Sequence, residues 1–204
     1  EVVGNPGLDI MDVDAVGKIA DEAGIPLILD ATFNTPYLLK PLEHGASIIV
    51  HSLTKWIGGH GIAIGGAVLD GGRFDWGASD KFPTIASPHY AMDGINFYEE
   101  FGPTAMTAKL RAEMMYNFGP CLSPTNAFHL LQGIETLPLR MQRHIENTDA
   151  LLAYLGAHDD VAWVRHPHLE SHPQHELAKR LMPKGAGSII TFGVKGGREI
   201  GRAS

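Results

Sequence analysis

Cysteine is almost absent from this sequence, and so are long apolar runs. The single cysteine, Cys121, cannot form an internal disulfide, and its setting "PCLSP" leads us to expect a small packed hydrophobe rather than a catalytic thiol. No window approaches the ~18 uninterrupted apolar residues that a membrane span requires, and no basic-then-apolar leader opens the chain. We therefore expect a soluble, cytoplasmic protein with no membrane partner.

Clustered positive charge is also missing. Sixteen Lys and Arg residues against 23 Asp and Glu residues give a formal net charge of −7, and the basic residues are spread along the chain. Without a basic stripe to follow a phosphate backbone, nucleic acid is not an expected partner. Apolar residues make up 44% of the sequence, which is enough for a substantial core.

Helical patterns alternate with short apolar runs in the first third of the chain. Apolar residues at helical spacing predict a helix that begins after Asp12 or Asp14 and stops at Gly24. Three runs are too hydrophobic to have a wet face and predict buried strands of a parallel sheet: "IPLILDATF", "ASIIVHSL" and "IAIGGAVLD". The alternation predicts an α/β fold with three layers and a mostly parallel sheet, in which ligands bind outside the carboxyl ends of the strands.

The rest of the chain predicts an excursion, long helices and a second domain. Residues 71–89 are rich in Gly, Pro, Ser and aromatic residues, and we expect them to cover a site or an interface. Residues 104–119 and 125–158 are expected to be helical, and the second stretch is long enough to link two domains. "VAWVRHP" and "GSIITFGVKGG" then predict strands. We therefore expect a large domain over 1–138 and, over 139–204, the linking helix and the start of a smaller α+β C-terminal domain.

The stretch "HSLTKWIGGHG" carries the most distinctive chemistry. Lys55 follows the hydroxyls of Ser52 and Thr54, which are suited to a phosphate, and precedes glycines that let a backbone approach a ligand closely. A phosphorylated aldehyde bound there would have its carbonyl carbon near the amine. Asp30, at the end of the neighbouring predicted strand, is suited to keep a pyridine nitrogen protonated. A lysine after a strand is more often solvated than catalytic, but this combination favours a pyridoxal phosphate site.

Three separated blocks resemble the Cys/Met-metabolism family of fold-type I pyridoxal-phosphate enzymes, in the family's order and spacing. They are "GNPGLDI", "LILDATFNTPYLLKPLEHGASIIVHSLTKWIGGHG" and "LLQGIETLPLRMQRH". The resemblance covers nearly the whole chain and implies the large domain of that fold. It also implies that Lys55 forms the Schiff base with pyridoxal 5′-phosphate and shuttles protons.

The resemblance extends to the residues around the cofactor. It implies that Asp30 pairs with the pyridine nitrogen and that Ser52 and Thr54 bind the phosphate. Asn5 matches a family asparagine near the ring hydroxyl and the substrate carboxylate, and Thr32 matches a residue beneath the ring. No metal ligand is implied.

The insertion that contains "RFDWGASDKFP" is similar to the sulfhydrylase branch of the family. The resemblance implies γ-replacement on O-acetyl-L-homoserine by sulfide or methanethiol, which gives homocysteine or methionine and acetate. Alternatives with the same cofactor are a methionine or cystathionine γ-lyase, a cystathionine γ-synthase and an O-succinylhomoserine sulfhydrylase. The implied partners are a small amino-acid substrate, sulfide and further copies of the chain in a dimer of dimers. At two positions, Ala31 and Asn34, the sequence departs from the residues that are usual in the family, and these departures concern fine substrate specificity.

Histidines and arginines outside this site have ordinary explanations. Four histidines in "HPHLESHPQHE" superficially suggest zinc, but two prolines interrupt them and we expect a solvated loop. A non-catalytic, histidine-rich metal-binding module is the alternative from another class. His60 is expected to be a loop or packing histidine, with contact to the cofactor phosphate as the less favoured alternative. Ion pairs on the linking helix are expected for Arg140 and Arg143.

Some family elements are not found in this sequence. The arginine that binds the substrate carboxylate belongs to an R-x-S-x-G-x-E-like segment, whose context Arg198 and Arg202 lack, and the phosphate loop and ring-stacking tyrosine would precede Glu1. We therefore expect an internal fragment of a protein roughly twice as long. Such a fragment is expected to expose an unpaired edge or an apolar face and to be inactive by itself.

Overall fold

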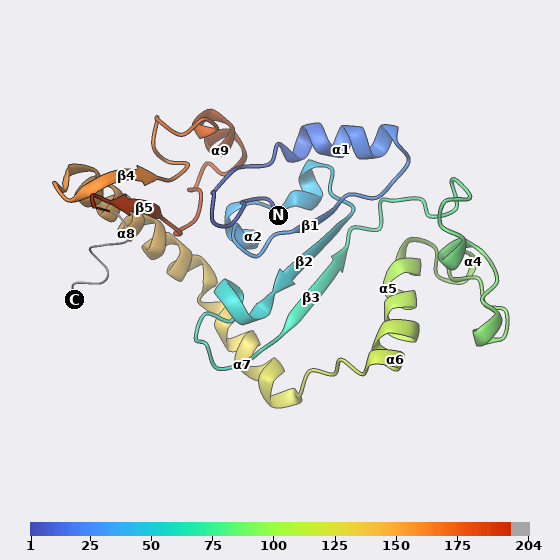
Figure 1. Ribbon diagram of the computed structural model, residues 1–204. Coiled ribbons are helices and arrows are strands. Elements are labelled where there is room, and N and C mark those ends of the chain that lie inside the picture. The colour runs from blue at the N-terminus through green and yellow to red at the C-terminus, as the bar shows by residue number, and fades with distance from the viewer. Residues whose placement is uncertain (197–204) are drawn as a thin grey trace.

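The computed structural model describes residues 1–196 of the chain (Figure 1). Arg198 and Arg202 lie outside the described residues. Within residues 1–196, no helix combines the length and the apolar character that crossing a bilayer requires.

A three-stranded sheet carries the predicted site residues. It consists of β1 (Ile28–Asp30), β2 (Ile48–Ser52) and β3 (Gly66–Asp70), in the order β1-β2-β3. β1 and β2 are parallel, but β3 runs antiparallel to β2, so the expectation of a parallel sheet is wrong for the third strand. A parallel return needs a crossover of about a dozen residues or more, usually a helix. Residues 53–65 are long enough for a crossover, but they form the turn around Lys55 and a glycine-rich loop instead of a helix that crosses the sheet.

The strands of this sheet differ in exposure. Ile48 of β2 is buried, whereas Val68 and Leu69 of β3 are 47% and 42% exposed. The expectation of strands with no wet face is therefore wrong for β3, and also for Ile28 of β1, which is 51% exposed. Ile62 and Ile64, which we expected in the same strand, lie in the loop before it and are also exposed. Apolar surface is therefore exposed, but Val68 and Leu69 are consecutive in β3 and point to opposite faces, so a single exposed apolar face stays a prediction.

The predicted first helix is confirmed as α1 (Val13–Glu22). The Asp12 side chain accepts a hydrogen bond from the N–H of Ala15 at 3.2 Å, which caps the helix, and Gly24 follows its end with φ at +60°. Gly17 of α1 lies directly against the backbone of Gly45, where a side chain would not fit easily. The helix therefore packs tightly onto the turn that leads into β2.

Short helices and an aromatic cluster form the middle of the chain. The α-helices are α2 (Thr35–Leu38), α3 (Pro83–Ala86), α4 (Phe97–Phe101), α5 (Ala105–Lys109) and α6 (Tyr116–Phe118), and 3₁₀ turns lie at Pro41–His44, Tyr90–Met92 and Gly102–Thr104. A π-helical segment, Leu110–Met115, joins α5 to α6. In the predicted excursion, Phe74, Trp76 and Phe82 pack edge to face and join a core cluster with Phe97 and Ala105. The excursion is thus anchored on α4 and α5, and its role as a cover stays a prediction.

The long helical stretch consists of two helices, α7 (Pro124–Glu135) and α8 (Leu137–Ala157). The break lies at Thr136 because Pro138 has no N–H to donate to the preceding turn and its ring crowds that turn. α8 leads from α7 to a second, antiparallel sheet of β4 (Val161–Arg165) and β5 (Thr191–Val194), with α9 (His175–Leu181) between them in sequence (Figure 1). The expected limit between 138 and 139 falls in the first turn of α8, and the division into two domains stays a prediction.

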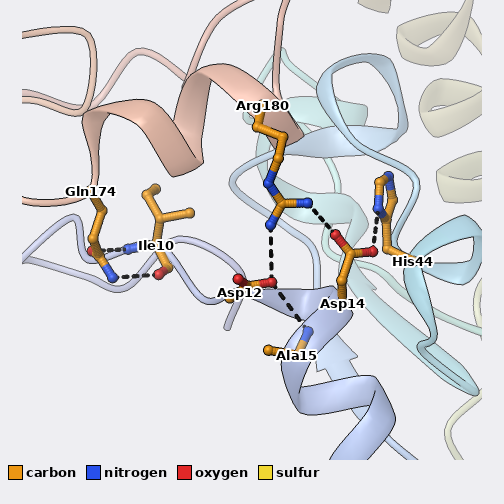
Figure 2. A network of polar contacts seen from close by, with 7 residues as sticks. All are labelled: Ile10, Asp12, Asp14, Ala15, His44, Gln174 and Arg180. Carbon is orange, nitrogen blue, oxygen red and sulfur yellow. Dashed lines mark hydrogen bonds and ion pairs between the residues drawn. The ribbon is translucent and has the colours of Figure 1, made fainter.

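A polar network joins α9 to α1 (Figure 2). Arg180 donates to Asp14 and, at 3.1 Å, to Oδ1 of Asp12, and Asp14 also contacts Nδ1 of His44 at 2.9 Å. The hydrogen bond from Arg180, supported by His44, lowers the pKa of Asp14. The Gln174 side chain bonds both the N–H and the carbonyl of Ile10 at 2.7 Å. The segment before α1 is therefore fixed to residues far along the chain.

Candidate functional site

The parallel pairing of β1 and β2 brings their carboxyl ends to one edge of the sheet. Asp30 ends β1, and Ser52 ends β2. Between them lies Thr32, whose N–H donates to Oδ1 of Asp30 at 2.8 Å and whose Oγ1 accepts from the N–H of Ser52 at 2.9 Å. Thr32 is only 8% exposed. Three of the predicted site residues are therefore linked by hydrogen bonds.

Thr54 is held from the β3 side. Its Oγ1 accepts a hydrogen bond from the N–H of Gly65 at 3.1 Å and donates one to the carbonyl oxygen of Gly65 at 3.3 Å, to which the N–H of Thr54 also donates. The hydroxyl thus fixes the loop before β3 in addition to the role that the sequence predicts for it.

Lys55 lies in a π-helical turn, Leu53–Ile57, that follows β2 directly. The Lys55 backbone, with φ at −91° and ψ at −126°, departs from helical values. The N–H of Gly58 donates to the carbonyl of Leu53 at 2.9 Å, and the N–H of Gly59 donates to the carbonyl of Lys55 at 2.7 Å. The Lys55 side chain is exposed and makes no hydrogen bond or ion pair within the part of the chain that the structure describes. Its amine is therefore accessible to a ligand.

Asn5 lies in an exposed turn near the start of the chain, where its N–H donates to the Glu1 side chain at 3.2 Å. Its predicted role near the ring stays a prediction. Asn34, one of the two departures, is buried, and its amide donates to the carbonyls of Thr35 and Leu39. This departure therefore stabilises the turn after β1.

His51 lies next to the predicted site, on β2, and is 6% exposed. Burial lowers its pKa, and the nearby Asp30 carboxylate opposes that shift. A neutral imidazole near Asp30 is therefore favoured. His60 is exposed and its Nδ1 lies 2.7 Å from the carbonyl oxygen of Gly58, as expected for a loop histidine.

Two expectations about other side chains are wrong. Cys121 is exposed in the loop between α6 and α7, not packed. His166 and His172 are buried instead of solvated, because the loop packs against α8 and turns tightly: His168 contacts Asp149 of α8 at 2.7 Å, and its N–H donates to His166 at 3.1 Å. Residues 1–196 contain no group of three or more His, Cys, Asp or Glu residues arranged to hold a metal ion.

Arg143 and Arg140 both lie on α8 but have different partners. Arg143 forms the expected ion pair, with Glu146 at 3.2 Å. Arg140 instead donates to the carbonyl oxygens of Trp56 at 2.8 Å and Ile57 at 3.2 Å, and it has no carboxylate partner among residues 1–196. The expected ion pair is wrong for Arg140 because α8 passes beside the Lys55 turn, whose carbonyls are its neighbours.

The sequence matches a known family over almost its full length. The model of the family described as Cys/Met metabolism PLP-dependent enzyme matches residues 1–203. A homocysteine synthase of Schizosaccharomyces pombe is 45% identical over 204 residues, which cover 99% of this chain and 48% of that protein. An O-acetyl-L-homoserine sulfhydrylase of Leptospira meyeri is 44% identical over 208 residues, with 98% and 47% covered. The chain thus spans about half the length of the curated relatives it matches.

Solved structures share the fold. A protein of Campylobacter jejuni whose structure contains N′-pyridoxyl-lysine-5′-monophosphate superposes with a TM-score of 0.90 at 32% identity, over 95% of this chain and 47% of that one. An O-acetylhomoserine sulfhydrylase of Wolinella succinogenes superposes with a TM-score of 0.82 at 36% identity, over 95% and 52% of the two chains. The predicted α/β class is confirmed by these similarities.

Proposed function

This chain belongs to the Cys/Met metabolism family of pyridoxal-phosphate-dependent enzymes, and on that premise we propose that the protein catalyses γ-replacement on O-acetyl-L-homoserine. Sulfide or methanethiol replaces acetate, which gives homocysteine or methionine. The observation that carries the proposal is the meeting of Asp30, Ser52 and Lys55 at the edge where β1 and β2 end. The choice of substrate is supported by the names of the relatives that are 44% and 45% identical.

The side chains at this edge fit the family's cofactor by their chemistry. Asp30 offers a carboxylate whose orientation is fixed by the N–H of Thr32. Ser52 and Thr54 offer hydroxyls, and Lys55 offers an exposed primary amine with no ion-pair partner in residues 1–196. When bound, pyridoxal phosphate supplies an electron sink for the charge that develops on the substrate carbon.

Each residue then has a defined task. The Asp30 carboxylate holds a proton on the ring nitrogen through its negative charge. The hydroxyls of Ser52 and Thr54 would donate hydrogen bonds to the phosphate and fix its position, that of Thr54 by turning its single proton away from the Gly65 carbonyl. The Nζ atom of Lys55 takes the proton from the substrate α-carbon and then transfers a proton at the β-carbon. Thr32 keeps Asp30 and Ser52 at a constant separation, because it is hydrogen-bonded to both residues.

We propose that this activity belongs to a longer protein that contains the chain, assembled as a dimer of dimers. Because the chain spans only about half the length of its relatives, the 204-residue chain alone is expected to be inactive. A cytoplasmic location stays a prediction.

Substrate turnover tests the proposal. The full-length protein is incubated with O-acetylhomoserine and sulfide, and in parallel with O-succinylhomoserine and sulfide, with O-acetylhomoserine and cysteine, and with methionine or cystathionine alone. Homocysteine formed from the acetyl ester and sulfide at the highest kcat/KM is the expected result. Preferential breakdown of methionine or cystathionine, preferential formation of cystathionine or preference for the succinyl ester would assign one of the alternatives. Full activity of the 204-residue chain would contradict the proposed need for the rest of the protein.

A further inference from the structure

Arg140 reaches from α8 to the turn that carries Lys55, and we propose that it is a positioning residue for the Lys55 amine. The inference rests on the proposed function, because it takes Lys55 as the residue that reacts with the cofactor. Arg140 is not proposed to touch the cofactor or the substrate.

The contacts lie immediately after Lys55 in the sequence. Nη1 of Arg140 donates to the carbonyl oxygen of Trp56 at 2.8 Å, and Nη2 donates to that of Ile57 at 3.2 Å. The N–H groups of Gly58 and Gly59 are already used within the turn. Arg140 therefore supplies hydrogen-bond donors to carbonyls at the end of the turn, where the π-helical pattern stops.

The guanidinium is itself fixed from its own side. Nε donates to Oγ1 of Thr136 at 3.0 Å, and Nη2 donates to the carbonyl oxygen of Gly133 at 2.8 Å. Both partners lie at the junction of α7 and α8. A planar guanidinium has five N–H donors in a rigid fork, so it can hold the helix junction and the Lys55 turn in one geometry. A lysine at this position has only three donors on one atom.

The backbones approach each other closely at this point. Gly59, with φ at +73°, has no side chain, and the Arg140 guanidinium occupies the space beside it. A side chain at position 59 would collide with the guanidinium. A side chain at Gly133 would collide with the carbonyl of Gly58. α7 and Arg140 therefore press directly on the backbone of the turn, so its position is set by these contacts.

The Lys55 side chain depends on this backbone for its direction. Its Nζ makes no hydrogen bond or ion pair within residues 1–196, so no polar contact in the described structure aims the amine. A misplacement of a reacting group by about 1 Å can cost on the order of a hundredfold in rate. Loss of the Arg140 contacts is therefore expected to slow the chemical step more than it weakens substrate binding.

The experiment compares Arg140→Met and Arg140→Lys with Arg143→Met in the full-length holoprotein. Arg143 is a matched control because it lies on the same helix, is 74% exposed and contacts only Glu146 among the described ion pairs. For Arg140→Met we expect kcat to fall about a hundredfold with KM nearly unchanged, and Arg140→Lys to recover part of the loss. Hydrogen exchange at the amides of Gly58 and Gly59 should accelerate in Arg140→Met and remain at the wild-type rate in Arg143→Met.

Failures of the inference and of the proposed function can be separated by fixing the cofactor with borohydride. No label on Lys55 in the wild-type holoprotein would overturn the proposed function and this inference with it. The positioning role alone would be overturned if Lys55 is labelled in the wild type but Arg140→Met keeps the wild-type kcat and the wild-type hydrogen exchange at Gly58 and Gly59. Loss of folding in both Arg140 variants would also overturn it, because the arginine would then support the fold and not the Lys55 turn.

Discussion

The Oγ1 atom of Thr32 accepts a hydrogen bond from the backbone N–H of Ser52 at 2.9 Å, across the gap between the ends of β1 and β2. The N–H of Thr32 donates in turn to the Asp30 carboxylate. Thr32 therefore connects the residue predicted to meet the ring nitrogen with a residue predicted to meet the phosphate. Its hydroxyl is part of the frame of the site, whatever contact it makes with the ring.

Replacing Thr32 by valine tests this link. Valine has nearly the same shape but no oxygen, so the partly buried N–H of Ser52 loses its acceptor, and the free energy of unfolding should fall by about 1 kcal/mol. Thr32→Ser keeps the oxygen and is the control, with a smaller loss expected. Urea unfolding of the three proteins measures the difference. Equal stabilities of Thr32→Val and the wild type would show that the hydrogen bond does not hold the strand ends.

Asp30→Asn tests the charge opposite the ring nitrogen. The amide oxygen can still accept the Thr32 N–H, so folding and cofactor affinity should be retained, while kcat should fall on the order of a hundredfold or more. Asp70→Asn is a matched control because Asp70 also ends a strand and accepts an N–H two residues later, from Gly72 at 2.9 Å. Titration with pyridoxal phosphate and steady-state kinetics give both quantities. Activity of Asp30→Asn within a few-fold of wild type would assign the nitrogen to another residue.

The two hydroxyls should behave differently when removed. Ser52→Ala should weaken cofactor binding about tenfold or more and change the melting temperature little, because a charge-assisted hydrogen bond is worth about 1.5–3 kcal/mol. Thr54→Ala should weaken binding and also lower the melting temperature, since Thr54 holds Gly65. Thr54→Ser should restore both. Cofactor affinities that stay at the wild-type value in the two alanine variants would remove the phosphate role.

His166 should make the fold sensitive to acid. Burial, followed by the nearby His168, lowers the pKa of His166 from 6.5 to about 4. Above the unfolded pKa the ring is neutral in both states; as the pH falls toward 4 the unfolded chain binds a proton that the folded chain does not, which lowers the free energy of unfolding by up to about 3 kcal/mol. His166→Asn removes this titration, and the exposed His60→Asn serves as the control.

The measurement is urea unfolding at pH 7.5 and at pH 4.5. The loss of stability between these values should be smaller in His166→Asn than in the wild type and in His60→Asn. The variant is expected to be less stable at pH 7.5, because a smaller side chain leaves a cavity in a fully buried position. An equal loss in all three proteins would show that His166 does not titrate in this range.

Local signals in the sequence account for the parts of the fold that were predicted correctly. The Asp12 cap, the period of α1 and the following Gly24 are all short-range, and so are the apolar runs of β1 and β2. Asp30 and Ser52 each stand at the end of a predicted strand. Because parallel strands end on the same side of a sheet, the sequence was enough to predict that the two residues lie at one edge. The break between α7 and α8 was not predicted, although Pro138 marks it in the sequence.

Long-range packing accounts for the rest. The direction of β3 depends on how residues 53–65 return along β2, which no local pattern specifies. His166 and Cys121 differ in burial because of where their loops fold, although both lie in proline-containing segments. The partners of Arg140 are carbonyls more than eighty positions earlier, near Trp56, and only the packing of α8 on the Lys55 turn reveals them.

Mapping the lysine that carries the cofactor tests the central claim most directly. The full-length protein is mixed with pyridoxal phosphate, reduced with borohydride, digested and examined by mass spectrometry, in parallel with Lys55→Ala. We predict a phosphopyridoxyl group on Lys55 in the wild type, and its loss in a Lys55→Ala protein that keeps its far-ultraviolet circular dichroism, since the exposed amine makes no hydrogen bond or ion pair within residues 1–196. A stoichiometric label on another lysine, or an undiminished label in Lys55→Ala, would contradict the account.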